Sequence, residues 1–274
     1  MRLFAISDLH LDSPSNFEAF AALPAFPEDW IIVAGDLASR FDRLEAGFAH
    51  LSDRFAQVIW VPGNHDLWTS PARKETEPGG VARYERVINL ARQYGVLTPE
   101  DPYRVWPHPA PDGRTILLAP LFLLYDYSFR PDHIALDDVV DWAREFRNVC
   151  ADETYLQPDP FKSRVDWCHD RLRQTEARLS PLVGEDVATI LINHWPLRAD
   201  LVRIPRIPRF TPWCGTVLTH DWHSRFKATC VVTGHLHTRR TDRIGGTRFE
   251  EVSLGYPIQW KSERGIADYF RRIL

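Results

Sequence analysis

The sequence predicts an α/β protein that contains two stacked β-sheets. Short apolar runs without alternation recur along the chain, and such runs suit strands that are buried on both faces. Helical patterns fill the gaps between the first runs, which is the βαβ order of a parallel sheet. Later strands and a hairpin supply the second sheet. The chain of 274 residues is long enough to bury a large core, and we expect one domain over residues 1–274.

Five of the apolar runs end in residue types that bind metal ions. The runs are Leu3 to Ile6, Trp30 to Ala34, Ala56 to Val61, Ala188 to Ile192, and Cys230 to Val232. They are followed in turn by Asp8 with His10, by Asp36, by Asn64-His65-Asp66, by His194, and by His235 with His237. In an open α/β sheet the carboxyl ends of neighbouring strands face one crevice. We therefore expect all five strand ends to converge on one site.

Periodic apolar residues predict the helices between and after these strands. Large apolar residues from Phe41 to Phe55 recur at intervals of three and four, so they share one helix face. A second helix is predicted over residues 81–94, where Gly95 supplies the stop. A third is predicted over residues 162–182 by a stripe with the same spacing.

The remaining elements include one more strand and a hairpin. Residues 115–122 read as a strand, and Gly245-Gly246 is the favoured two-residue turn between runs 239–244 and 247–254. The tail over residues 267–274 is compatible with either a strand or a short helix.

The residue types at the strand ends indicate which ions they would hold. The set comprises two aspartates, one asparagine and four histidines: Asp8, His10, Asp36, Asn64, His194, His235 and His237. A mixture of carboxylate, amide oxygen and imidazole suits Mn, Fe, Zn or Ni better than Mg or Ca. Seven ligands are too many for one tetrahedral ion. They suit two ions about 3.5–4 Å apart that share a carboxylate, as in two-metal hydrolases.

The order of these blocks resembles that of the calcineurin-like metallophosphoesterase superfamily. The matching blocks are Asp8-x-His10, Gly35-Asp36, Gly63-Asn64-His65-Asp66, His194, and Gly234-His235-x-His237. The resemblance implies a four-layer α/β/β/α sandwich of two mixed β-sheets flanked by helices. It also implies two divalent ions, with Mn²⁺ expected first and Fe, Zn, Ni or Co as alternatives.

The resemblance also assigns a role to each matching residue. Asp8, His10, Asp36 and His237 would hold the first ion, and Asp36, Asn64, His194 and His235 the second, so that Asp36 bridges them. A hydroxide that bridges the two ions would attack phosphorus in line. Among the remaining residues, His65 would donate a proton to the leaving oxygen while Asp66 orients its imidazole. The amide nitrogen of Asn64 would remain available for a substrate oxygen.

The expected activity is hydrolysis of phosphomonoester or phosphodiester bonds in a small organic phosphate. A cyclic-nucleotide phosphodiesterase, a nuclease and a non-catalytic scaffold on the same fold are the alternatives. The segment Gly35 to Arg40 departs from the GDxVDRG pattern of the Ser/Thr protein phosphatases, which argues against that branch. A net charge of −4 and a pI near 6.3 give no overall attraction to nucleic acid or to anionic membranes.

Two stretches interrupt the strand and helix alternation, and we expect them to form a small cap over the metals. The first covers residues 124–161 and offers Tyr125 and Tyr127 for stacking on a substrate ring. The second covers residues 198–212, where prolines disfavour regular structure. Its side chains Arg203, Arg206 and Arg209 would bind an anionic group. The alternative for these arginines is a role as solvated surface charges.

Apolar run length and cysteine spacing indicate the compartment. The first run, Leu3 to Ile6, is too short for the core of a signal peptide, and no later run reaches the length of a membrane span. The four cysteines form no CxxC pair, so reduced structural thiols are expected. Together these features predict a cytoplasmic protein, and the sequence leaves its oligomeric state open.

Overall fold

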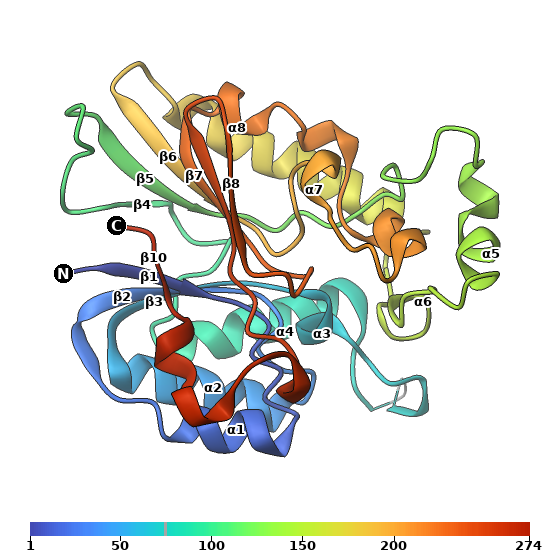
Figure 1. Cartoon of the computed structure of the whole chain (residues 1–274), viewed down its shortest axis with the longest axis horizontal. Helices are drawn as coiled ribbons and strands as arrows, with labels where there is room; N and C mark the ends of the chain where they lie inside the picture. Colours follow the sequence, from blue (N-terminus) through green and yellow to red (C-terminus); the bar gives the residue numbers. More distant parts are fainter. Residues whose placement is uncertain (74–75) are drawn as a thin grey trace.

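Two β-sheets packed face to face form the centre of the computed structural model, which describes residues 1–73 and 76–274 (Figure 1). The first sheet has the order β10-β1-β2-β3. Its strands are β1 (Leu3–Ile6), β2 (Phe26–Ala34), β3 (Phe55–Val61) and β10 (Arg271–Arg272). The first three are parallel, and β10 pairs with β1 in the antiparallel direction. This sheet is therefore mixed.

The second sheet has the order β4-β5-β6-β7-β9-β8. Its strands are β4 (Arg104–Val105), β5 (Thr115–Pro120), β6 (Val187–Ile192), β7 (Ala228–Thr233), β8 (Arg240–Ile244) and β9 (Thr247–Glu251). The four central strands are parallel, whereas β4 and β8 pair at the edges in the antiparallel direction. The hairpin β8–β9 is the one predicted around Gly245-Gly246.

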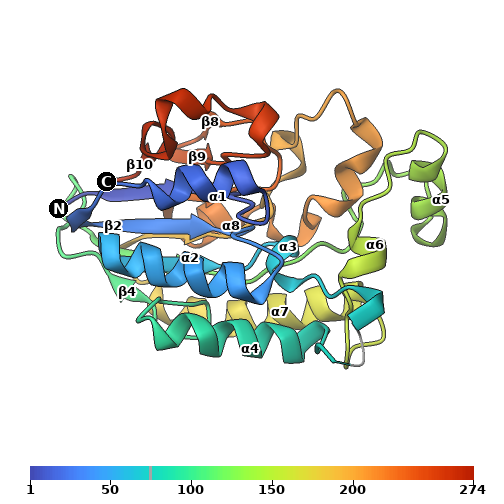
Figure 2. The ribbon, with the colours of Figure 1, turned by 90° about the horizontal axis from the view of Figure 1, so that it is seen from below.

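Helices cover the outer face of each sheet, as the two views show (Figures 1 and 2). The first sheet is covered by α1 (Pro14–Ala21), α2 (Phe41–Arg54) and α4 (Gly80–Gln93). The second is covered by α7 (Arg164–Leu179) and α8 (Trp222–Arg225). Three short helices lie near the strand ends, namely α3 (Asn64–Leu67), α5 (Val139–Arg144) and α6 (Asp152–Tyr155). The predicted α/β/β/α sandwich of two mixed sheets is confirmed.

Alternate residues of the same strand contribute to two separate parts of the core. Ala5, Ile32 and Ile190 point inwards and pack between the two sheets. Trp60 and Leu191 point outwards and pack with the helices. Successive side chains on a strand point to opposite faces, so a strand between a sheet and a helix layer must be apolar at every position. This explains why the apolar runs show no alternation.

Several predicted boundaries differ from the structure. The third predicted helix ends at Leu179, and Ser180–Leu182 forms a 3-10 turn because the ring of Pro181 disfavours a continued α-helix. The tail contains both predicted forms, a 3-10 helix over Ile266–Tyr269 and then β10. The proline-rich stretch 198–212 is less irregular than expected, since it includes 3-10 helices over Ala199–Leu201 and Pro208–Trp213.

The two interrupting stretches lie side by side at the carboxyl ends of the strands, on the right of Figure 1. Residues of the stretch 198–212 contact α5 of the stretch 124–161 through Arg209. Its guanidinium donates to the carboxylate of Glu145 at 2.6 Å and to the backbone carbonyl of Trp142, and it lies over the ring of Phe146. The two stretches are therefore packed against each other.

Candidate metal centre

The structure brings the predicted metal ligands together at the strand ends. Three overlapping groups have ligand atoms within 4.8 Å of one another: Asp8 with His10 and His237, His10 with Asp36 and His65, and Asp8 with Asp36 and His194. They come from the ends of β1, β2, β3, β6 and β7. Asn64 adjoins them, because its Oδ1 lies 3.2 Å from Nε2 of His194. His235 also lies beside these groups, since its ring centroid is 5.1 Å from that of His194.

The backbone at this site adopts a conformation that residues with a Cβ rarely use. Asp8, His10, Asp36, His235 and His237 have φ angles of 54°, 43°, 55°, 73° and 53°. Positive φ angles in non-glycine residues carry a steric cost and persist only where the surroundings fix them. Five of the seven predicted ligands share this feature. The backbone after β1, β2 and β7 is thus bent where it carries these five ligands.

Glycines next to the predicted ligands are required by close approach. A Cβ on Gly63 would collide with the carboxylate of Asp36, and one on Gly234 would collide with the side chains of Ser7 and Asp8. Glycine therefore precedes Asn64 and His235 for a steric reason, because the space beside Gly63 and Gly234 has no room for a Cβ. A side chain at either glycine would push a carboxylate out of the centre.

Asp8, His10 and His237 form what we call the first ligand group. Nε2 of His237 lies 3.0 Å from Oδ1 of Asp8 and 3.2 Å from Nε2 of His10. The other carboxylate oxygen of Asp8 accepts hydrogen bonds from Ser7 Oγ at 2.5 Å, from Ser253 Oγ at 2.7 Å and from the backbone N–H of His235 at 3.0 Å. These donors fix Asp8 so that its Oδ1 faces the two imidazoles.

Asn64, His194 and His235 form the second ligand group. Nδ1 of His194 lies 2.8 Å from the carbonyl oxygen of Ala34. A carbonyl can only accept, so Nδ1 carries the proton and Nε2 has a free lone pair. That Nε2 lies 3.6 Å from Oδ2 of Asp36. Among the described residues, Nε2 of His235 is buried and has no hydrogen-bond partner.

Burial controls the charges at the centre. It lowers the pKa of His10 to about 3, and it also lowers the pKa of His65, His194 and His235. Burial and the charges of Asp8 and Asp66 raise the pKa of Asp36 well above its usual value. Burial opposes ionisation of Asp8, but the charge and hydrogen bond of His237 together with the charges of His194 and His10 outweigh it and lower the pKa of Asp8. Neutral imidazoles are the form that binds metal ions.

These groups fit a divalent cation. Two buried carboxylates and an imidazole nitrogen without a partner are costly in a protein interior unless a cation neutralises and coordinates them. The donor set of carboxylate, amide oxygen and neutral imidazole matches Mn, Fe or Zn. The geometry is therefore that of a metal centre.

The centre opens into a cleft of about 300 Å³. Its lining consists of Asp36, Asn64, His65, Trp68, Cys150, Ala151, Ile207, Phe210, His235, Leu236, His237, Tyr256 and Gln259. Residues from both interrupting stretches thus form part of its wall. The lining combines the polar ligands with apolar side chains.

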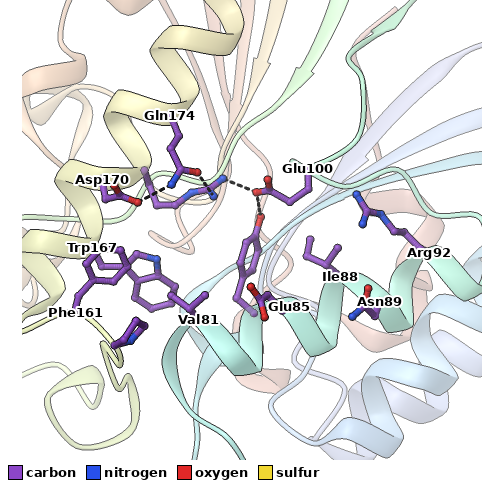
Figure 3. Close-up of a pocket in the computed structure, with 13 residues that line it drawn as sticks. Val81, Glu85, Ile88, Asn89, Arg92, Glu100, Phe161, Trp167, Asp170 and Gln174 are labelled. Atoms are coloured by element: carbon purple, nitrogen blue, oxygen red, sulfur yellow. Dashed lines mark hydrogen bonds and ion pairs between the residues drawn. The ribbon is translucent and has the colours of Figure 1, made fainter.

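A larger cleft of about 460 Å³ lies between α4 and α7 (Figure 3). Its described lining includes none of the predicted ligands. Arg171 donates to the carboxylate of Glu100 at 2.6 Å, and the hydroxyl of Tyr84 donates to the same oxygen at 2.6 Å. These charged groups satisfy one another. Cleft size therefore does not locate the reactive site of this protein.

The family model for calcineurin-like phosphoesterases matches residues 1–239. The chain belongs to this family. It is therefore a phosphoesterase, a hydrolase that depends on divalent metal ions. No helix of the described residues is long and apolar enough to cross a membrane.

Two further comparisons report individual proteins to which this phosphoesterase is similar. It is 43% identical over 274 residues to the [acyl-carrier-protein] phosphodiesterase PptH of Mycobacterium tuberculosis, a match that covers 99% of this chain and 83% of that protein. The crystal structure of phosphopantetheinyl hydrolase (PptH) from the same organism aligns with a TM-score of 0.88 at 42% identity, covering 100% and 95% of the two chains. A 5'-nucleotidase from Candida albicans aligns with a TM-score of only 0.41 at 12% identity, covering 99% and 51%.

The prediction that Asp66 orients the imidazole of His65 was wrong. The carboxylate of Asp66 accepts backbone N–H groups of Asp36, Gly63 and Ala38 at 2.9–3.1 Å, so it holds two loops together instead. Burial raises its pKa to about 7. The ring of His65 lies on Trp68 with a centroid distance of 3.6 Å. Its Nε2 lies 3.4 Å from the hydroxyl of Tyr256 and 3.9 Å from Oδ2 of Asp36.

The amide nitrogen of Asn64 also has a partner that sequence reasoning missed. It donates one of its two hydrogens to Oδ1 of Asp152 at 2.9 Å, so the predicted donation to a substrate oxygen would use the other. Trp68 donates to the same oxygen at 2.7 Å. Asp152 is fully buried at the start of α6. Its position in an interrupting stretch gave no signal, because a lone aspartate outside any motif has no recognisable pattern.

The predicted substrate side chains lie elsewhere than expected. Tyr125 is 0% exposed and Tyr127 is buried with its hydroxyl on Glu153 at 2.6 Å, so the prediction that they stack on a substrate ring needs correction. The guanidinium of Arg209 is bound by Trp142 of α5 and by Glu145. Arg203 and Arg206 are exposed, and the described lining of the cleft contains none of the three arginines. From that stretch it contains Ile207 and Phe210 instead, so apolar groups take the place predicted for cations.

Proposed function

We propose that this phosphoesterase holds two divalent ions in its metal centre. Asp8, His10, Asp36 and His237 would hold the first, and Asp36, Asn64, His194 and His235 the second, with Mn²⁺ as the expected metal. The observation that supports this most is the buried, unpartnered Nε2 of His235 beside the buried carboxylates. Two such ions would activate water as a nucleophile and neutralise charge on the phosphoryl oxygens.

The side chains around the ions would orient the substrate and supply a proton. His65 lines the cleft, and Trp68 and Tyr256 hold its ring in place. We assign it the role of proton donor to the leaving oxygen. Burial and His10 lower its pKa in the free enzyme. A phosphodiester anion next to it would oppose that effect, because a nearby negative charge favours the protonated imidazole.

The proposed substrate is a phosphodiester that links a phosphopantetheinyl group to an acyl carrier protein. The similarity to PptH along nearly the whole chain supports this choice. It replaces the free small phosphate expected from the sequence. The reaction would be hydrolysis of one phosphodiester bond with water as the nucleophile.

The rim of the cleft supports a protein substrate. Four large apolar side chains on or beside the rim are exposed: Tyr155 at 36%, Ile207 at 41%, Tyr256 at 43% and Ile258 at 94%. Ile207 and Tyr256 line the cleft, and Tyr155 packs on Trp68 of the lining. Ile258 lies outside the described lining of the cleft, so a small ester bound there would not depend on it. Apolar side chains gathered around a site are typical of protein–protein contact surfaces.

We also propose that residues 124–161 and 198–212 act as a cap on a single domain. Cys150 and Ala151 come from the first stretch and Ile207 and Phe210 from the second, and all four line the cleft. The four cysteines are buried and free, which supports the proposal of a reducing, cytoplasmic compartment.

The test compares a phosphopantetheinylated carrier protein with bis(4-nitrophenyl) phosphate as substrates of the Mn²⁺-loaded enzyme. We expect turnover of both. Substitution Ile258→Glu should lower kcat/KM for the carrier protein about tenfold, which is about 1.4 kcal/mol, and leave the small diester unchanged. The exposed Leu218→Glu serves as the control, because Leu218 lies outside the described lining of the cleft.

Two results would contradict the proposal. One is turnover of the small diester without release of the phosphopantetheinyl group from the carrier protein. The other is an equal loss on both substrates in Ile258→Glu, which would place the effect in the metal centre and not in protein contact.

A further inference from the structure

The segment Leu254 to Trp260 lies beyond the residues that the family model matches, yet it returns to the metal centre. Backbone N–H groups of Leu254 and Gly255 donate to the carbonyl oxygens of Ser7 and Asp8 at 2.8 and 3.0 Å. At its other end, the indole of Trp260 donates to Asn16 at 3.1 Å. Both ends of the segment are therefore fixed to the region around β1.

Gln259 in this segment fixes the orientation and tautomer of His237. Its Oε1 lies 2.7 Å from Nδ1 of His237 and accepts the backbone N–H of Tyr256 at 2.7 Å. The backbone N–H identifies this atom as oxygen, and an amide oxygen can only accept. Nδ1 of His237 must therefore carry a proton. Nε2, which faces Asp8, is then the nitrogen that can bind a metal ion.

Gly255 makes room for this contact. Its φ angle is 91°, and a Cβ at this position would lie 2.6 Å from Oε1 of Gln259. A larger residue would displace the amide from His237 even if Gln259 itself were unchanged.

The same segment also contacts the other imidazole of the first ligand group. The ring of Tyr256 stacks on that of His10 with a centroid distance of 4.4 Å and an interplanar angle of 15°. The second ligand group has other supports, since His194 bonds Ala34 and Asn64 bonds Asp152. The segment is thus placed to act on one of the two proposed ions.

We propose that Gln259 is a positioning residue for the ion held by Asp8, His10 and His237, an inference that rests on the proposed two-ion assignment. Its role is to hold the Nδ1–H of His237, so that Nε2 is presented to the ion. Partners of this kind affect metal affinity by about 10–100-fold in other proteins.

The experiment measures Mn²⁺ binding to the full chain after removal of all metals, by competition with a fluorescent chelator. Gln259→Leu removes the acceptor and should weaken the binding of one ion about 10–100-fold while the other keeps its affinity. Gln259→Glu supplies a stronger acceptor and should bind that ion at least as tightly as the parent does. Gly255→Ala should reproduce the defect of Gln259→Leu. Ile258→Ala is the matched control in the same turn, and we expect parental affinity.

The outcomes separate this proposal from the others. Parental affinity in both Gln259→Leu and Gly255→Ala would overturn it, and so would equal weakening of both ions. A parent chain that binds only one Mn²⁺ ion would contradict the two-ion assignment. Weakening of that single ion by Gln259→Leu, with recovery in Gln259→Glu, would still support the role of Gln259. The assay uses no substrate, so it does not depend on the carrier-protein proposal.

Discussion

His194 and His237 present the same atom to the metal centre, but different parts of the chain hold them in place. The Nδ1–H of His194 bonds the carbonyl of Ala34 at the end of a central strand, whereas that of His237 bonds the side chain of Gln259. The first support comes from the backbone of the fold. The second comes from a side chain that the family model does not cover.

This difference predicts that the supports of the two ligand groups respond differently to substitution. A backbone carbonyl cannot be lost by substitution, so the support of His194 persists as long as the strand does. A side-chain support such as Gln259 changes with a single codon. The second ligand group also has one side-chain support, because Asn64 bonds Asp152 of an interrupting stretch. The predictions below test how far the two groups can be separated.

The largest effect is expected where the two groups meet, at Asp36. This carboxylate lies between both groups and is buried. Asp36→Asn removes a negative charge that would offset both ions, so we expect loss of most bound metal and a fall in kcat of about 10²–10³-fold or more. Metal analysis and turnover of bis(4-nitrophenyl) phosphate measure the two effects. Full occupancy with near-normal turnover would show that the groups do not share a ligand here.

The next effect concerns a residue that belongs to neither group. His65→Gln should leave both ions bound but slow hydrolysis by about 10²-fold or more for esters with an alkyl leaving group, because the proton donor is lost. Nitrophenyl esters need less protonation and should be affected less. Equal losses on alkyl and nitrophenyl esters would count against the proton-donor role, and loss of metal would move His65 into one of the ligand groups.

Asp152 provides the counterpart of Gln259 in the second ligand group. Asp152→Ala removes the acceptor for Asn64 and Trp68, so we expect the affinity for one ion to fall about 10–100-fold. Asp152→Asn keeps an acceptor oxygen and should retain more affinity. Asp152 and Gln259 contact different ligands, Asn64 and His237, so the double variant Asp152→Ala/Gln259→Leu should weaken both ions with free energies that add except for the coupling through the shared Asp36. Strong non-additivity in chelator competition would show that the two groups are coupled.

The predicted ligands could be found from the sequence because each follows a buried strand. Leu3–Ile6 and Ala188–Ile192 are apolar on both faces, and polar residues immediately after such runs can be recognised without any knowledge of contacts. Their neighbours could not be found in this way. Asp152 reaches Asn64 across 88 residues and Gln259 reaches His237 across 22, so both contacts depend on how loops return to the site.

The interrupting stretches show the same limit of prediction from sequence. Tyr125 and Arg209 have residue types that suit a substrate site, and their positions in the chain place them near the metal ions. The folded chain nevertheless buries Tyr125 in the core and pairs Arg209 with Glu145. Residue type alone does not determine which side of a loop faces a cleft, because the packing of that loop decides it.

The smallest effect is expected at the two exposed arginines of the stretch 198–212. Arg203 and Arg206 lie outside the described lining of the cleft, and Ile207, which follows them, lies within it. Among the described residues, the one ion pair of Arg203 is a long contact with Asp242 at 3.9 Å. Replacement of both by Ala should therefore leave Mn²⁺ content and turnover of bis(4-nitrophenyl) phosphate unchanged.

For a carrier-protein substrate, exposed charges near the rim contribute about 0.2–1 kcal/mol each, so KM should rise by a few-fold, and the rise should shrink at high salt. Arg225→Ala, at the end of α8, is the control for each single replacement, because it removes one positive charge outside the described lining of the cleft. An unchanged KM for the carrier protein at low salt would remove these arginines from the contact surface. A loss of turnover on the small diester would instead place them in the metal centre, against the positions that the structure gives them.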